Sequence, residues 1–520
     1  MEELNDLERA TMDERKDDDL VKKENIIILI GSIVLAVIFN ILFYRKQLGV
    51  SYPIFVIVLY GVMLFTLRNK IERKISFGTI LTIPVVMLSL TYLLFSNPVF
   101  GFFNFFIVPT LICIQTLLIT NNNNYMWFDI RILLDFLNAV FVRTLGHIFL
   151  PFRLLSGIIK RKHGSNKVSV LGKVVIGLLI SVPLVIVVIA LLSEADDVFS
   201  YWVENISDYF ISINFGDFVA QLIIGFCGAV IAFSYFWSLY NKADKDIVID
   251  GEGTLKNKKV WDPVIIITVL VSINIIYVVF TTIQFTYLFG SVSSLLPEGV
   301  TYAEYARRGF FELVAVTLIN LSLVTSIIGF TRNDNKFTQT ILKILNSLLI
   351  FCTMIMLLSA HFRMSLYEQE YGYTYLRVFT HAFMIFIFFI LIATLIKVWK
   401  EKFSLIKSYI ILGLIAYISI NYFNADAYIA KNNIERYETD GGKTIDIYYL
   451  GTLSDDAVPY MVKLLDNPNE EVAKGIKNNL GLRKARLSSG NDWQSFNLSR
   501  YRAKNILDEC DLVIEEDNKR

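Results

Sequence analysis

The stretch "FFELVAVTLINLSLVTSIIGF" (310–330) decides the fold class, because it is long and apolar enough to cross a membrane as a single helix. Directly before it, "TYAEYARRG" (301–309) places Glu304, Arg307 and Arg308 where that helix would leave the lipid. Glu304, Arg308 and Glu312 follow one another at intervals of four residues, so they form one stripe on a helix. An unpaired charge at the position of Glu312 would cost several kcal/mol in lipid, so the stripe predicts paired charges.

Ten further apolar blocks of similar length occur along the 520 residues, 54% of which are hydrophobic. We therefore predict an all-α integral membrane protein, a bundle of about 11 transmembrane helices with a small helical region after it. The predicted spans are 26–44, 48–67, 76–95, 98–120, 170–193, 218–240, 263–288, 309–330, 338–360, 376–398 and 404–421.

Three parts are expected along the chain. Residues 1–25 hold ten acidic and five basic side chains and are predicted to be a disordered cytoplasmic head. Residues 26–421 form the membrane domain, with amphipathic helices along the membrane surface at about 127–160 and 196–213. Residues 422–520 form an external helical tail, in which 455–480 have the pattern of one hairpin of a helical-repeat protein.

The distribution of basic residues predicts the orientation. With a cytoplasmic N-terminus, the cytoplasmic segments hold 26 Lys and Arg and the external loops hold five. This asymmetry follows the positive-inside bias and places the C-terminal tail outside the cytoplasmic membrane. The net charge of +1 gives no indication of nucleic-acid binding. Lys160, Arg161 and Lys162 either contact anionic lipid headgroups or form an ordinary basic loop that sets the topology.

Charged and polar residues recur at the predicted external helix ends, and they are the main functional lead. The candidates for a ligand site or an ion-pair cluster are Asp196, Glu304, Arg307, Arg308, Glu312, Glu368, Arg377, Asn424 and Asp426. Asn274, Thr281 and Gln284 add a polar face to the seventh span. Two interpretations stay open: a structural network that locks the bundle, and a site for a ligand, an ion or a headgroup.

The sequence contains no catalytic signature, since a Walker A loop, a GxGxxG motif and a GxSxG elbow are all missing. Its four cysteines form no CxxC pair, and His361 and His381 lack metal-binding spacing, so we expect no metal and no cofactor. Three functions stay open. The first is an envelope or signalling-accessory protein with an external interaction surface and an envelope protein partner. The second is a permease for a small solute or ion, and the third is an enzyme acting on a lipid-linked substrate.

Four phrases carry a resemblance to a known family: "LSEADDVF" (192–199), "EYARRGFFEL" (304–313), "YEQEYGYTYLR" (367–377) and "NADAYIAKNNIERY" (424–437). Together they resemble a bacterial polytopic membrane family, domain of unknown function four-one-seven-three, related to family four-one-five-three. The resemblance runs from about the second span into the tail. It implies a multi-span envelope protein of a Gram-positive bacterium and implies no activity.

Overall fold

The computed structural model describes residues 20–71, 74–163, 215–241, 260–289, 310–332, 335–439, 445–489 and 492–512, and a few isolated positions between 177 and 201. Within these residues the regular structure is helical, with one isolated β-bridge between Trp261 and Thr331. The chain is therefore an all-α protein over its described part. It divides into two compact units, each of which gathers segments far apart in the sequence.

The described residues contain nine helices long and apolar enough to cross a membrane, or ten if one bent pair counts as a single span. The protein is thus a multi-pass membrane protein. The predicted span 48–67 corresponds to a shorter helix, α3 (Ser51–Thr66). The predicted span 170–193 and the amphipathic helix 196–213 lie mostly outside the described residues.

The first unit contains the N-terminal helices, in which α2 packs along both α3 and α12. The side chain of Asn40 on α2 donates to the carbonyl of Gln221 on α12 at 2.9 Å, and Arg45 pairs with Asp217 at 2.9 Å. The helices of this unit are α2 (Lys23–Phe43), α3, α4 (Phe77–Ile80), α5 (Thr82–Leu94), α6 (Pro98–Ile119, whose first turns belong to the second unit), α7 (Ile132–Leu137), α8 (Thr144–Gly146), α9 (Leu150–His163) and α12 (Phe215–Tyr240).

The segment 127–160, predicted as an amphipathic surface helix with a break near Pro151, is bent. Its first part, residues 132–146, and its second part, residues 150–158, meet at an angle of 45°, directly before Pro151. Proline lacks an N–H and fixes its φ angle, so it suits the start of the second part. Lys160, Arg161 and Lys162 belong to the last turn of α9, and their contact with lipid stays a prediction.

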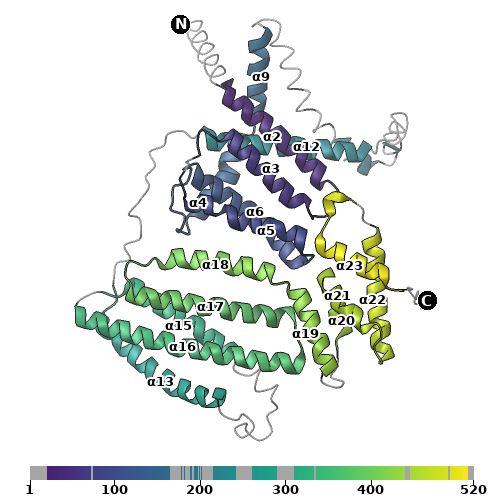
Figure 1. Cartoon of the computed structure of the whole chain (residues 1–520). Helices are drawn as coiled ribbons and strands as arrows, with labels where there is room; N and C mark the ends of the chain where they lie inside the picture. Colours follow the sequence, from purple (N-terminus) through teal and green to yellow (C-terminus); the bar gives the residue numbers. More distant parts are fainter. Residues whose placement is uncertain are drawn as a thin grey trace. The chain divides into compact units, whose positions relative to one another are not determined.

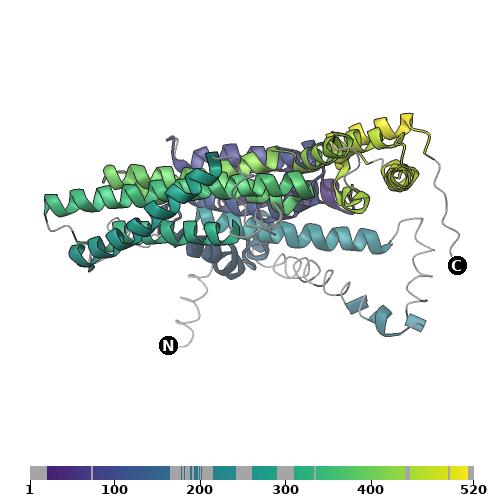
Figure 2. The same ribbon diagram turned by 90° about the horizontal axis from the view of Figure 1, so that it is seen from below.

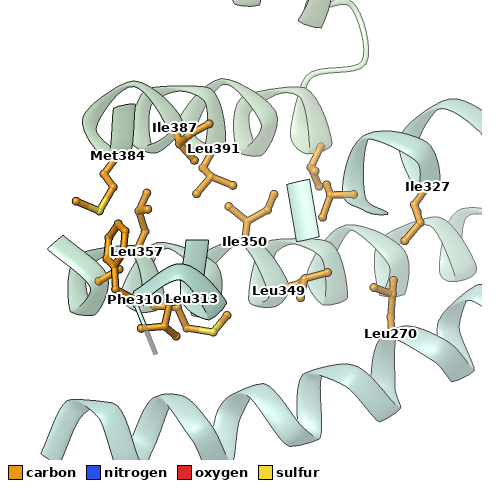
Figure 3. Packing of buried hydrophobic residues seen from close by; sticks show 14 of the residues in the cluster. Leu270, Phe310, Leu313, Ile327, Leu349, Ile350, Leu357, Met384, Ile387 and Leu391 are labelled. Carbon is orange, nitrogen blue, oxygen red and sulfur yellow. The ribbon is translucent and has the colours of Figure 1, made fainter. Parts of the chain in front are cut away.

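The second unit is built around a set of long helices. In Figure 1 and in the turned view of Figure 2, the green helices α16, α17 and α18 run side by side. These helices and those around them are α13 (Pro263–Phe289), α15 (Phe310–Phe330), α16 (Lys336–Tyr371), α17 (Tyr375–Trp399) and α18 (Leu405–Tyr422). Apolar side chains from α13, α15, α16 and α17 fill the space between them, among them Leu270, Leu313, Ile350 and Met384 (Figure 3).

The tail folds as short helices with their own buried core. Of the seven apolar residues that define the predicted hairpin, Leu465 is partly buried and the other six are buried there: Val458, Met461, Leu464, Val472, Ile476 and Leu480. The same core includes Val378 of α17, so the tail helices pack on the end of a membrane helix. The tail contains α19 (Ala425–Thr439), α20 (Ile447–Thr452), α21 (Val458–Met461) and α22 (Glu470–Ser488), followed by α23 (Leu498–Glu509).

Candidate functional site

Helix α16 continues well past the end of the predicted span at residue 360. The segment 361–371, which the predicted spans leave in a loop between residues 360 and 376, is the last part of this helix, so the prediction of a loop is wrong. It contains no glycine or proline before Gly372, whose φ of +79° ends the helix. The three residues 372–374 then lead into α17. Because the helix continues, Glu368 and His361 lie beside His381 of α17. Arg363 lies beside Gln284 of α13.

A buried carboxylate and two imidazoles meet between α16 and α17. Oε2 of Glu368 lies 3.0 Å from Nε2 of His381, which is an ion-pair distance, although the angle is outside that of a regular hydrogen bond. Nδ1 of His381 lies 2.7 Å from Nδ1 of His361. Two nitrogens at this distance share one proton, because two N–H groups would repel each other. We call Glu368, His381 and His361 the relay cluster.

A second polar contact lies beside the relay cluster on the side of α13. Oε1 of Gln284 accepts from Oγ of Ser359 at 2.7 Å and from Nη2 of Arg363 at 3.1 Å. All three residues are buried. The contact therefore joins α13 to α16 and places a guanidinium in the interior of the helix set, where it is surrounded by protein rather than lipid.

Further polar contacts continue along the same helix interface. Tyr277 of α13 donates to Oδ1 of Asn320 on α15 at 2.9 Å, and Nδ2 of Asn320 donates to Oγ1 of Thr353 on α16 at 2.9 Å. Nearer the start of α16, Asn274 donates to the carbonyl of Leu345 at 3.1 Å. We call this series the polar seam. It begins beside Asn346 and reaches Glu368, a distance of roughly 33 Å at 1.5 Å per residue, which is about the thickness of the hydrocarbon core.

Several atoms of the polar seam have no hydrogen-bond partner among the described residues. Among them are the acceptors Oδ1 of Asn274, Oδ1 of Asn346 and Oε1 of Glu368, each in a side chain that is at most 5% exposed. Buried polar atoms are nearly always paired with protein or water, because an unpaired one costs about 1–3 kcal/mol. Water, a solute or a residue outside the described part would complete the bonding of these acceptors.

Arg377, a predicted site residue, stabilises the turn between α16 and α17. Its guanidinium donates to the carbonyl oxygens of Tyr371, at 3.0 Å, and of Gly372, and it lies 4.5 Å from the ring centre of Tyr367. It thus satisfies carbonyls at the end of α16 that have no partner within the helix.

Helix α19 holds the other side of this turn. Asn433 exchanges two hydrogen bonds with the backbone of Tyr373, accepting at 2.7 Å and donating at 2.8 Å. Arg436 donates to the carbonyl of Glu370 at 3.0 Å. Burial raises the pKa of the Tyr373 phenol, with the carboxylate of Glu368 adding to that effect. The tail is therefore fixed to the helix end that carries the relay cluster.

Asp426 lies in a separate buried network. Its carboxylate accepts from Nδ2 of Asn97 at 2.6 Å, from the backbone N–H of Ser454 at 2.8 Å and from the hydroxyl of Tyr375. It is 1% exposed, and its three donors come from three distant segments of the chain. Such a carboxylate fixes the positions of those segments, so we assign Asp426 a structural role.

Asn424 bonds to a second carboxylate, Asp456, which Ser454 links to Asp426 by donating to both. It has a φ of +51°, caps α19 by accepting from the N–H of Ala427 at 3.3 Å, and donates to Asp456 at 3.2 Å. Asp456 also accepts from the N–H of Ser96 at 2.8 Å. Burial raises the pKa of Asp456 in spite of these hydrogen bonds, which act in the opposite direction.

The remaining predicted site residues do not join these clusters in the described part. Asp196 is exposed and accepts from the N–H groups of Val198 and Phe199, at 2.8 and 2.9 Å, as a local cap. Glu312 is exposed near the start of α15. Glu304, Arg307 and Arg308 lie outside the described residues, so their pairing with Glu312 stays a prediction.

Sequence reasoning placed Glu368 among the candidates and noted the polar face of Asn274, Thr281 and Gln284. It missed the partners Asn97 and Tyr375, because nothing in their sequence context indicates the carboxylate of Asp426, which is 329 residues from Asn97 along the chain and on another helix than Tyr375. It also missed Asn346, one of several polar residues in a mostly apolar block, which resembles many buried asparagines in membrane helices.

The fold and this seam define a polytopic membrane protein with ionisable groups inside its helix bundle. Residues 82–464 match the model of the family described as Domain of unknown function (DUF4153). The chain belongs to this family. Searches of curated proteins and of solved structures gave no match.

Proposed function

We propose that this protein is a proton-coupled permease for a small polar solute, in which Glu368, His381 and His361 carry the proton. The observation behind this proposal is the relay cluster and its position at one end of a polar seam as long as the membrane is thick. Ionisable residues inside membrane bundles are costly, and chains of carboxylates and histidines are typical of proton pathways.

The chemistry of the relay cluster suits proton transfer. Glu368 accepts a proton from the aqueous side and passes it to Nε2 of His381, 3.0 Å away. His381 then hands on the proton at Nδ1, which lies 2.7 Å from Nδ1 of His361. Histidine suits this task because its charge changes near neutral pH.

A purely structural role, in which the polar side chains hold the helices together, would be enough to explain the interhelical hydrogen bonds, since such bonds join membrane helices in many proteins. This role does not explain Oδ1 of Asn274, Oδ1 of Asn346 and Oε1 of Glu368, which are buried and find no partner among the described residues. Water or a solute along the seam would satisfy them. These acceptors favour a pathway over a purely structural network.

The basic-residue asymmetry supports an orientation in the cytoplasmic membrane with the N-terminus inside and the tail outside. In that orientation the relay cluster faces the external side, and the start of α16 faces the cytoplasm. The resemblance noted from the sequence supports a bacterial cell envelope as the setting.

The test uses the full chain in liposomes loaded with a pH-sensitive dye. A pH gradient is imposed, and mixtures of amino acids, of sugars and of inorganic anions are added in turn. We expect one mixture to cause proton uptake in the wild type and in Glu370→Gln, an exposed neighbour on the same helix, and no uptake in Glu368→Gln. Absence of solute-dependent uptake in the wild type, or wild-type uptake in Glu368→Gln, would overturn the proposal.

The tail favours a second function, an accessory role through an external interaction surface with an envelope protein. Two large side chains on its helices are open to solvent: Tyr448 of α20 is 86% exposed and Leu482 of α22 is 64% exposed. Exposed aromatic and aliphatic residues are frequent at protein contacts. If this surface binds a partner, Tyr448→Ser and Leu482→Ser should abolish a crosslink formed in intact cells, while proton uptake stays unchanged. A crosslink that both variants retain contradicts the accessory role.

A further inference from the structure

A cavity of about 360 Å³ opens at the start of α16, at the opposite end of the polar seam from the relay cluster. Its polar lining consists of Thr331 after α15, Gln339, Lys343 and Asn346 of α16, Lys397 of α17 and the following Glu401. Isoleucines of α15 and a leucine of α16 supply the apolar part. Its volume is within the range of small-molecule sites, roughly 300–1,000 Å³.

The inner polar groups of this cavity call for a hydrogen-bond donor. Asn346, which lines the cavity, is 3% exposed and uses its amide nitrogen to donate to the carbonyl of Leu342 at 2.8 Å, which leaves Oδ1 as a buried acceptor. Neither this atom nor Oγ1 of Thr331, in a side chain 4% exposed, has a partner among the described residues. A carbonyl oxygen can only accept, so the ligand must bring an N–H or O–H group.

The outer part of the cavity carries two ammonium groups. Nζ of Lys343 lies 3.4 Å from Oε1 of Glu401, a long ion pair whose carboxylate side chain is 68% exposed. Nζ of Lys397 donates to the backbone carbonyl of Glu401 at 2.6 Å. A pair this exposed contributes little, so an anion can compete with Glu401 for the ammonium of Lys343.

We infer that this cavity binds a small zwitterion, with its ammonium at Asn346 and its carboxylate or phosphate at Lys343 and Lys397. An anion alone would leave Oδ1 of Asn346 unsatisfied, and a cation alone would face two lysines. Both a free amino acid and the ethanolamine phosphate headgroup of a lipid have this chemistry. The inference deepens the proposed function by naming its class of solute, while the cavity itself is testable without any transport.

The experiment measures equilibrium binding to the full chain in detergent, with L-leucine, phosphoethanolamine, ethylamine and acetate as separate probes. We expect one zwitterion to bind, with affinity at least about tenfold weaker in Asn346→Leu and in Lys343→Met, a loss of about 1.4 kcal/mol. Lys336→Met, which removes an exposed lysine of the same helix outside the cavity, is the matched control and should bind like the wild type. Leucine binding identifies a free amino acid, and phosphoethanolamine binding identifies the headgroup.

Three outcomes would overturn the inference: no zwitterion binds, acetate binds as tightly as the zwitterion, or Lys343→Met retains wild-type affinity. Thermal unfolding of each variant shows whether it is folded. Because Glu368→Gln alters only the far end of the seam, it should bind normally. If the wild type binds the zwitterion but shows no solute-dependent proton uptake, that result contradicts the proposed function and leaves the zwitterion site standing.

Discussion

Nε2 of His381 lies 3.0 Å from Oε2 of Glu368, between two helices that the chain joins through a three-residue turn. The contact exists because α16 extends to Tyr371, so that its last turns lie alongside the first turns of α17. It places a carboxylate that is 5% exposed next to the one side chain type that titrates near neutral pH.

Replacement of Glu368 by glutamine should separate stability from function. Glutamine has nearly the same shape and no charge, and His381 can stay neutral beside it, so no buried charge is left unpaired. We expect the free energy of unfolding to change by less than about 1 kcal/mol, within the range of mild substitutions. Thermal unfolding in detergent measures this. A large loss of stability would mean that Glu368 holds the bundle together, and this structural role would explain the residue without a role in transport.

Gly372 should tolerate no side chain. Its φ is +79°, and a Cβ there would lie 2.5 Å from Oδ1 of Asn433. Gly372→Ala should therefore lower stability by about 1–3 kcal/mol, the cost of a strained backbone position. Gly413→Ala on α18 is the control, because a Cβ there meets nothing within 4 Å and the helix gains about 0.5–1 kcal/mol from alanine. Equal effects of the two changes on the unfolding midpoint would refute this account of the turn.

Asp426→Asn should weaken the link between the tail and the membrane helices. The carboxylate accepts from Asn97, Ser454 and Tyr375, and an asparagine would turn an N–H₂ group toward at least one of these donors. Loss of a hydrogen bond to a charged group costs about 1.5–3 kcal/mol. The exposed Asp508→Asn on α23 should be neutral. Limited proteolysis of the tail, compared between the two variants, checks the prediction, which fails if their cleavage rates agree.

Asp456 should give the tail a stability that depends on pH. Burial raises its pKa above the ordinary value of 3.8, so the folded state binds the proton more tightly than the unfolded state does. Its contribution to stability is therefore present below pH 3.8 and is lost as pH rises through the raised folded value. Asp456→Asn should remove this loss, so that the difference in unfolding midpoint between variant and wild type grows with pH across that window. A constant difference at every pH would contradict the shift.

Labelling of Cys510 should report the side of the membrane on which the tail lies. Cys510 follows α23 and is partly exposed, whereas Cys113, Cys227 and Cys352 lie within helices long and apolar enough to span. In the proposed orientation a membrane-impermeant maleimide should modify Cys510 in intact cells, and Cys510→Ser should abolish that signal. Modification only after lysis would place the tail in the cytoplasm and reverse the assignment of the two ends of the seam.

The amino-acid sequence by itself determined that this is an all-α, multi-pass membrane protein, and it marked where several helices begin and end. Apolar blocks of span length leave few alternatives in lipid, because every backbone polar group must bond within its own helix. The local signals that end α16 at Gly372 and cap α23 at Asn497, which accepts from the N–H of Arg500 at 3.0 Å, were not used in the predicted boundaries. The apolar positions of the tail hairpin were also readable, because that segment alternates polar and apolar faces.

Only the tertiary structure decided which polar residues meet. Glu368 pairs with His381 and Asn320 with Tyr277 between different helices, and Asp426 of α19 pairs with Asn97, which directly precedes α6. In a membrane helix the lipid-facing and the protein-facing sides are both apolar, so the pattern of hydrophobic residues does not reveal which side faces a neighbour. The order and rotation of the helices determine which side faces a neighbour. They therefore also determine whether polar residues that are scattered along the sequence come together in the polar seam.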